Sequence, residues 1–524
     1  MLQARQLKAC SCRGQHQHHV QHSSTVLRRS SAAFHRLAQP HAAAAVQPAL
    51  NSQGTSSACG TAAGGVSSSK RSTIAARMVC RDAPRPMWAA KQAQSETPNV
   101  SGGMMERMIT SEIARCDTLV GLSDIYSQWN NSFNYIHASA ALVKCGKLPG
   151  GGRSSLVDKM CSTWLTQLPL SDLQGCSNVL WACVRLESGA VQRLWGPTWE
   201  AYIQLLKRES TAEGVVKPQQ VASPLWACAK LRKLPSVDDL QLMVQTSLKP
   251  EMLADAKPQA LSNIVWALGE LCQLPGWQGG VNEQDVQQLL GKQQLLLVCD
   301  SGRVSSNVVY GLARMAGGKA PVINVEFARD CSKQLLALCC GRLGSWNSQD
   351  ITNTMWACGE LGLADTAFVA AAVAAAPRWL PCSMHVDLNQ VLAACVALQY
   401  RDEAFVQACL HQGLQLLAQQ QPSRQGRSSR RPLAAPARDQ LAAVCCISVA
   451  RLDMRSTANT AVDLVSRSGV PQRPSTNPIN LAKLWVFHSW LVQHQLLDGK
   501  GLTGVLTQQQ LQRGAKDAAT MGLS

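Results

Sequence analysis

The chain has 524 residues, of which 46% are apolar and 16% charged, a composition that excludes a wholly disordered protein and allows a large core. The formal net charge is +17, but residues 1–81 contain ten Lys/Arg and no Asp or Glu. The other 443 residues therefore carry only +7, and the body of the protein is predicted to be nearly neutral.

Residues 1–81 are rich in Arg, Ser, Ala, Gln and His and contain no compact apolar run. This composition is typical of an organelle transit peptide and not of a folded domain. The stretch IAARMVCRDA at 74–83 favours a chloroplast over a mitochondrion, which remains the alternative. We expect a disordered, removable extension over 1–81, followed by a linker and N-terminal capping helix over 82–130.

A nine-residue sequence motif, Asn-x-x-Trp-Ala-x-x-x-Leu, recurs through the centre of the chain. We call the Trp position the anchor; it is occupied by Trp181, Trp226, Trp266, Tyr310 and Trp356, and in degenerate copies by Ala140 and Leu392. Successive anchors are 41, 45, 40, 44, 46 and 36 residues apart. A period near 40 with variable gaps indicates stacked helix pairs. The predicted fold is all-α, a right-handed α-solenoid of antiparallel helix pairs with about 38–46 residues per repeat.

Each repeat is predicted to contain two helices. The first carries the anchor, with a Ser/Thr-Asn pair interpreted as its N-cap: Ser177-Asn178, Ser262-Asn263 and Thr352-Asn353. The second helices are predicted at 237–248, 283–299, 325–341 and 402–420. We expect the anchor to pack between stacked helices, because Tyr, Leu and Ala also occupy it, and favour this role over stacking on a nucleic-acid base.

The 21 cysteines include no CxxC pair and no Cys/His spacing typical of zinc, so neither a metal nor a cofactor is predicted. Cys183, Cys228 and Cys358 lie two residues after an anchor and are interpreted as small core residues. So many free thiols indicate a reducing compartment. No apolar run reaches the ~18 residues of a membrane helix, and no catalytic constellation is recognisable, so we predict neither a membrane span nor an enzyme.

The solenoid is predicted over 131–420. The Arg-rich stretch 421–438 is interpreted as a disordered insertion, 439–497 as C-terminal helical repeats and 498–524 as a tail.

The repeated Asn-x-x-Trp-Ala-x-x-x-Leu motif resembles the octotricopeptide repeat family of organellar proteins, over about 131–400 and more weakly to about 495. FAST-kinase-like helical arrays use a similar pattern. The segment 480–497 is similar to the helices that precede a RAP domain in this broader group, but the RAP domain itself is expected to be missing. The resemblance implies a non-catalytic adaptor that binds single-stranded organellar RNA, alongside other organellar RNA-metabolism proteins, in transcript stability, processing, splicing or translation.

Repeat proteins that read RNA present a few polar residues per repeat at a fixed phase. Two positions in the repeat qualify. The first lies three residues before the anchor and is taken by His137 and Pro224 in the variant copies of the motif. The second lies four residues after the anchor. The candidate residues are Asn178, Asn263, Asn307, Asn353 and Asn389 at the first phase, and Lys144, Arg185, Lys230, Glu270, Arg314 and Glu360 at the second. Helix capping and an ordinary solvated helix face are the alternative roles.

Two other functions stay open. A protein-binding solenoid scaffold would present an apolar or acidic groove, whereas an RNA-binding solenoid would present Arg, Lys and amides. A degenerate RAP-type processing factor would need a carboxylate cluster in 498–524, where only Asp498 and Asp517 occur.

Overall fold

The structure is a computed structural model, and over the residues it describes its regular elements are all helices, joined by turns and loops. The described residues are 100–186, 189–211, 216–291, 294–295, 298, 301–318, 321–364, 367–418, 433–473 and 476–523. The predicted extension 1–81 lies outside them, as does most of the predicted insertion at 421–438. Of the described residues, those from 107 onward belong to one compact unit. The repeats discussed below lie in this unit.

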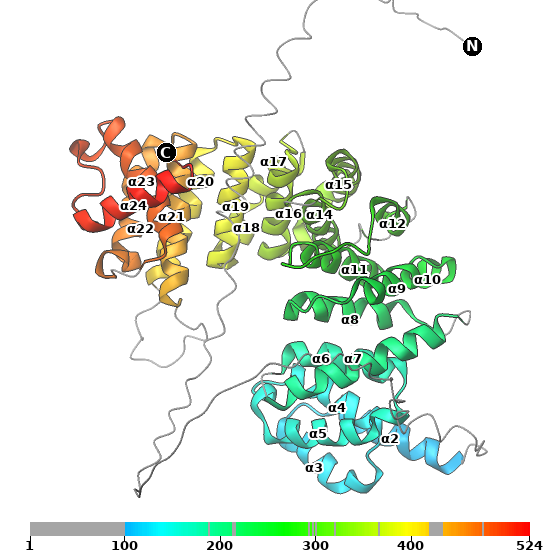
Figure 1. Cartoon of the computed structure of the whole chain (residues 1–524). Coiled ribbons are helices and arrows are strands. Elements are labelled where there is room, and N and C mark those ends of the chain that lie inside the picture. Colours follow the sequence, from blue (N-terminus) through cyan, green and yellow to red (C-terminus); the bar gives the residue numbers. More distant parts are fainter. Residues whose placement is uncertain are drawn as a thin grey trace, which may run out of the picture. The chain divides into compact units, whose positions relative to one another are not determined.

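The predicted first helices are present and follow one another side by side (Figure 1). They are α4 (Tyr135–Lys147), α6 (Leu173–Arg185), α8 (Pro218–Leu231), α11 (Pro258–Leu271), α14 (Gly302–Ala316), α16 (Ser348–Leu361) and α19 (His385–Leu398). Each packs on the next, and the series continues through α21 (Ala435–Arg451), α23 (Pro478–Gln493) and α24 (Gln508–Thr520). This arrangement is an all-α helical-repeat solenoid.

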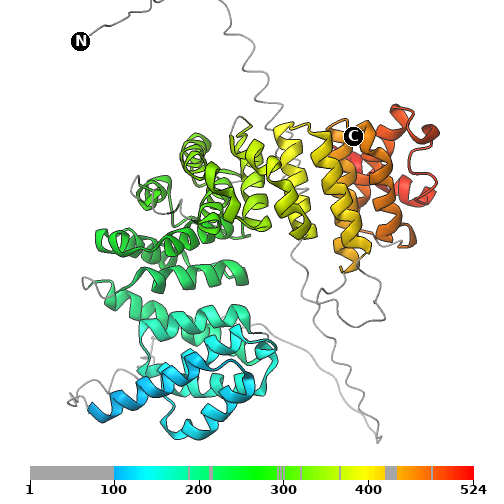
Figure 2. The ribbon, with the colours of Figure 1, turned by 180° about the vertical axis from the view of Figure 1, so that it is seen from behind.

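The second helices follow the first in chain order, and most of them pack against the first helix that precedes them (Figure 2). They are α5 (Ser155–Gln167), α7 (Gly189–Glu209), α9 (Val237–Ser247), α12 (Glu283–Leu289), α15 (Val325–Cys339), α17 (Ala367–Ala374), α20 (Glu403–Ala418) and α22 (Ala458–Ser468). Helices α2 (Val100–Arg115) and α3 (Leu119–Trp129) precede the repeats, and the short α10 (Pro250–Asp255) and α18 (Ala376–Trp379) lie between them.

The repeat period also appears in hydrogen bonds between neighbouring repeats. Trp199 Nε1 donates to Asp239 at 3.3 Å, and Gln245 Nε2 donates to Asp285 at 3.2 Å. Gln288 Nε2 donates to the Leu248 carbonyl at 3.0 Å. Each bond spans 40 residues, so the sequence period corresponds to the physical step from one repeat to the next.

The predicted caps of the first helices are wrong. Helix α6 begins at Leu173, where the Asp172 carboxylate accepts from the Gly175 backbone N–H at 2.7 Å. Helices α8 and α11 begin with a proline, which is preorganised for the first helical position. The Ser/Thr-Asn pairs therefore lie inside the helices, with the Ser or Thr buried between neighbouring first helices.

Two predicted boundaries in the C-terminal part also change. Helix α21 begins at Ala435, inside the range predicted as a disordered insertion. The predicted tail contains α24, whose Thr507 hydroxyl and Gln510 side chain form a capping box. Helix α24 packs on α23, so residues 508–520 extend the stack of first helices.

The prediction that cysteines after the anchor are small core residues is confirmed. Cys183, Cys228 and Cys358 are all buried. Burial raises the pKa of Cys183 to about 12, so its thiol remains protonated at neutral pH. These cysteines fill space where first helices approach closely.

Lys483 of α23 is only 1% exposed, and burial lowers its pKa from 10.5 to about 7. Since the folded-state pKa lies below the unfolded one, the unfolded chain holds this proton more tightly. The resulting destabilisation is full below pH 7 and fades as pH rises towards 10.5. We expect Lys483→Met to raise the free energy of unfolding by roughly 2–4 kcal/mol at pH 7. The free energy of unfolding of the wild type should increase between pH 7 and 10, and that of Lys483→Met should increase less.

Urea unfolding followed by circular dichroism across this pH range would test the effect. Lys500→Met provides the control, because Lys500 is exposed and its replacement should change stability by less than about 0.5 kcal/mol. Parallel pH profiles for the wild type and Lys483→Met would contradict the assignment.

Candidate nucleic-acid interface

The first helices from α6 to α16 expose one narrow line of side chains each. Counted from the anchor, positions −7, −3, 0 and +4 share one helix face, and their residues are exposed or half-buried except Ser223 and Trp356, which are buried. Almost every other residue of these helices is buried. We call this line the first-helix stripe: Gln174, Asn178, Trp181, Arg185; Gln219, Ser223, Trp226, Lys230; Gln259, Asn263, Trp266, Glu270; Arg303, Asn307, Tyr310, Arg314; Gln349, Asn353, Trp356, Glu360.

The structure thus places the two predicted phases on the same face, together with the anchors. Position −7 was not predicted. Its residues are mostly Gln, and in two helices the side chain donates to the Asn one turn later: Gln174 Nε2 to Asn178 Oδ1, and Gln259 Nε2 to Asn263 Oδ1, both at 2.9 Å. A Gln or Arg four residues before the motif's Asn was the sequence signal for this position.

The predicted Asn residues are not equivalent in their surroundings. Asn178, Asn263, Asn307 and Asn353 are half-buried on the stripe, whereas Asn389 of α19 is buried. In the variant copies, His137 is buried and its Nδ1 accepts from the Asn134 backbone N–H at 3.2 Å. In α8 the matching residue is Ser223 and not Pro224, which lies one position later.

The anchors pack between neighbouring first helices, as predicted, but most keep an exposed edge. The rings of Trp181 and Trp226 stack with centroids 6.3 Å apart, and those of Tyr310 and Trp356 lie 4.9 Å apart. Trp356 is buried, while Trp181, Trp226, Trp266 and Tyr310 are half-buried. The anchor side chains therefore contribute both to packing and to the surface.

Cations lie over the anchor rings, an arrangement the sequence did not reveal. The Arg185 guanidinium is 5.7 Å from the Trp181 ring centroid. The Lys230 ammonium is 5.8 Å from that of Trp226 and 4.3 Å from that of Trp266 in the next repeat. Cation–π attraction restrains these positive charges at the surface. The Lys147 ammonium at the end of α4 also lies 5.8 Å from the Trp181 ring centroid. Positive charge is therefore concentrated around the N-terminal end of the stripe.

The other +4 residues mainly join neighbouring repeats. The Tyr310 hydroxyl donates to the Glu270 carboxylate at 2.9 Å, and Arg314 Nε lies 3.3 Å from the same carboxylate. Lys144 donates to the Ala114 carbonyl at 2.7 Å, outside the stripe. Glu360 is half-buried on α16. Among the predicted +4 residues, Arg185 and Lys230 are therefore the exposed cations best placed to meet a ligand.

The bond between Tyr310 and Glu270 gives a direct stability test. Hydrogen bonds to charged groups contribute about 1.5–3 kcal/mol, so Tyr310→Phe should lower the free energy of unfolding by roughly that amount. Tyr400→Phe is the control, because the hydroxyl of this half-buried tyrosine has no hydrogen bond within the described residues. Denaturant unfolding of both variants would measure the difference, and equal losses would rule out a stabilising role for the bond.

The stripe is hollowed where α11, α14, α16 and α19 meet. The hollow has a volume of about 650 Å³ and is lined by Trp266, Tyr310 and Asn353, with Met384 and His385 at the start of α19. Burial lowers the pKa of His385, which keeps its imidazole neutral at physiological pH. The hollow thus combines aromatic, amide and apolar groups.

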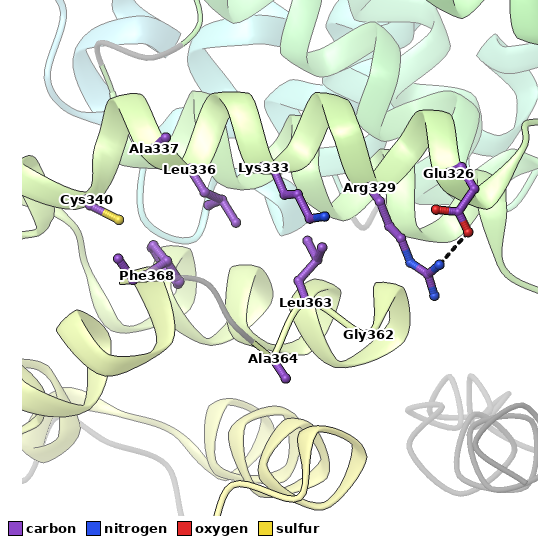
Figure 3. A pocket seen from close by; sticks show the side chains of 11 residues that line it. Glu326, Arg329, Lys333, Leu336, Ala337, Cys340, Gly362, Leu363, Ala364 and Phe368 are labelled. Carbon is purple, nitrogen blue, oxygen red and sulfur yellow. Dashed lines mark hydrogen bonds and ion pairs between the residues drawn. The ribbon is translucent and has the colours of Figure 1, made fainter. Parts of the chain in front are cut away.

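A second hollow, of about 510 Å³, lies between α15 and the start of α17 (Figure 3). Leu336, Leu363 and Phe368 form its apolar lining. Arg329 is engaged in structure: its Nε donates to the Leu361 carbonyl at the end of α16 at 2.6 Å, and it pairs with Glu326 at 2.5 Å. This hollow belongs to a second helix and is not part of the first-helix stripe.

Within the described ranges, no three His, Cys, Asp or Glu side chains come together as metal ligands. The same ranges contain no helix with the length and apolar character to cross a bilayer.

Comparison with known proteins finds no family model and no curated relative that matches the chain. The assignment of function accordingly depends on the geometry and chemistry of the stripe.

Proposed function

We propose that this chain binds single-stranded RNA along the first-helix stripe and acts as a non-catalytic adaptor in post-transcriptional control of organellar RNA. The observation that carries the proposal is the regular combination of restrained cations, half-exposed aromatic rings and amides on one face of successive repeats. Cations attract phosphates, whereas amides can bond base edges.

The geometry of the repeat suits a single strand. Packed helices lie about 8–10 Å apart, a step that allows one repeat to address roughly one nucleotide of an extended strand. The residues at −7 and −3 vary in two of the five repeats: they are Gln-Asn in α6, α11 and α16, Gln-Ser in α8 and Arg-Asn in α14. Such variation along a constant scaffold is what sequence-selective reading requires.

The composition of the stripe supports RNA over a protein partner. A protein-binding groove would be expected to be apolar or acidic, but Arg185, Lys230 and Arg303 are exposed on the stripe, beside amides. Glu270, its central carboxylate, is already paired with Arg314 and Tyr310. For the RAP-type alternative, Asp517 pairs with Arg513 at 3.7 Å, which gives no support to a carboxylate cluster.

We place the RNA target in an organelle because residues 1–81 have the composition of a transit peptide, with the chloroplast first and the mitochondrion as the alternative. Fusing residues 1–81 to a fluorescent protein would test the address: signal in the cytosol would exclude import.

Fluorescence anisotropy with a labelled mixed-sequence single-stranded RNA would test binding. We expect saturable binding, weaker binding of duplex RNA, and a plot of log K against log salt with a slope of roughly −2, since about three phosphate contacts each contribute about −0.7. Absence of RNA binding at low salt would contradict the proposal and favour a protein-binding scaffold.

A further inference from the structure

The hollow in the first-helix stripe has the size of a small-molecule site. Its volume of about 650 Å³ lies within the range of roughly 300–1,000 Å³ found for such sites. Trp266 and Tyr310 contribute aromatic surface, and Gln349, Asn353 and Gln390 contribute amides from α16 and α19.

The amides of α16 differ from those of α6, α8 and α11. In α6 and α11 the Gln at −7 bonds the Asn at −3, and in α8 Gln219 Nε2 donates to the Ser223 hydroxyl at 2.6 Å. Gln349 and Asn353 occupy the same two positions but have no side-chain hydrogen bond within the described part of the chain, and both line the hollow. This repeat therefore offers two amides that can bond a ligand without first breaking an internal bond.

The row of anchor rings is interrupted at the same place. Trp181 stacks on Trp226, and Tyr310 lies against Trp356. Trp266 has the Lys230 ammonium 4.3 Å from its centroid but no ring partner among the residues that the structure describes. Its half-exposed ring borders the hollow and offers an aromatic surface to a planar ligand.

Charge around the hollow selects among planar ligands. Lys230 lies on its rim and can bond a phosphate, whereas Glu270 and Asp387 place carboxylates along its lining that add negative charge although both are bonded within the fold, Glu270 by Tyr310 and Arg314 and Asp387 by the Met384 backbone N–H. Carboxylates attract amino groups and repel carbonyl oxygens. Adenine and cytosine both present an amino group beside a ring-nitrogen acceptor, the pair that an Asn or Gln amide bonds at both atoms, and adenine has the larger ring surface to lie on Trp266. Uracil presents two carbonyl oxygens, which the carboxylates disfavour.

We infer that this hollow is an adenine-binding pocket, in which Gln349 and Asn353 bond the base edge, Trp266 contacts the ring and Lys230 bonds the phosphate. The inference rests on the proposed function, because the pocket is the point of the stripe at which one base of a bound RNA would be read.

Isothermal titration of the full chain with AMP, CMP and UMP tests the pocket alone, since a mononucleotide does not need the rest of the stripe. We expect AMP to bind at least fivefold more tightly than CMP or UMP. The double variant Gln349→Ala/Asn353→Ala should lower AMP affinity at least tenfold. The matched variant Gln192→Ala/Gln204→Ala, which removes two exposed amides of the second helix α7 outside the stripe, should change it less than twofold.

Thermal unfolding confirms that both variants fold. Equal affinities for the three mononucleotides, no AMP binding, or unchanged AMP affinity in Gln349→Ala/Asn353→Ala would overturn the pocket assignment. These outcomes are separable from failure of the proposed function: RNA binding without AMP binding removes only the pocket, whereas AMP binding without RNA binding removes only the extended interface.

Discussion

Replacing Arg185 and Lys230 together with Glu is expected to weaken single-stranded RNA binding at least tenfold at about 100 mM salt. Both residues are exposed cations of the first-helix stripe, supported by the rings of Trp181, Trp226 and Trp266. Their replacement removes two phosphate contacts and adds repulsion. The slope of log K against log salt should become shallower by about 1.4, or about 0.7 for each contact.

The control for this variant has the same charge change on another face. Lys159 of α5 and Lys207 of α7 are exposed on second helices, so Lys159→Glu/Lys207→Glu alters net charge equally but leaves the stripe intact. Anisotropy titrations at several salt concentrations would compare the two. If both variants lose affinity to the same extent, binding follows net charge and the stripe has no special role.

Gly311→Val is expected to have the largest effect on stability. A Cβ at Gly311 would lie 2.5 Å from the Val265 carbonyl oxygen, and one at Gly269 would lie 2.7 Å from the Gly311 carbonyl oxygen. Helices α11 and α14 thus meet backbone to backbone, and neither carbonyl can move without disturbing its helix. Overpacking commonly costs about 1–3 kcal/mol, and we expect Val to reach or exceed the upper end of that range.

Thermal unfolding would measure the loss, with Gly103→Val as the control because nothing lies within 4 Å of a Cβ at Gly103 of α2. The control should be neutral or slightly stabilising, since Gly is unfavourable inside a helix. Similar melting temperatures for the two variants would show that the close approach of α11 and α14 is not required.

The fold was predictable from sequence because the period near 40 and the helical spacing of apolar residues report the same repeating unit. The second helices at 237–247 and 325–339 lie within a few residues of their predicted limits. Cysteines after the anchors are buried, as their phase indicated. These features depend on local pattern, which a single sequence contains.

The site was predictable only in part, because its main contacts join residues from different repeats. The positions of Asn178 and Arg185 within the repeat were predictable from the sequence. The placement of Lys230 over the ring of Trp266 was not, because these residues belong to different repeats. The helix starts were missed because the Ser-Asn pair resembles a cap, whereas Pro258 was the stronger signal. The partial exposure of the anchors was not predictable either. It depends on how neighbouring helices cover each first helix, and they leave only a narrow face to solvent.

Mapping ultraviolet crosslinks between the full chain and a 4-thiouridine-labelled single-stranded RNA by mass spectrometry tests the central claim most directly. We expect crosslinked peptides from the first helices α6, α8, α11, α14 and α16, centred on stripe residues such as Trp181 and Trp266. Crosslinks confined to the second helices or to the Arg-rich segment 422–438 would contradict it.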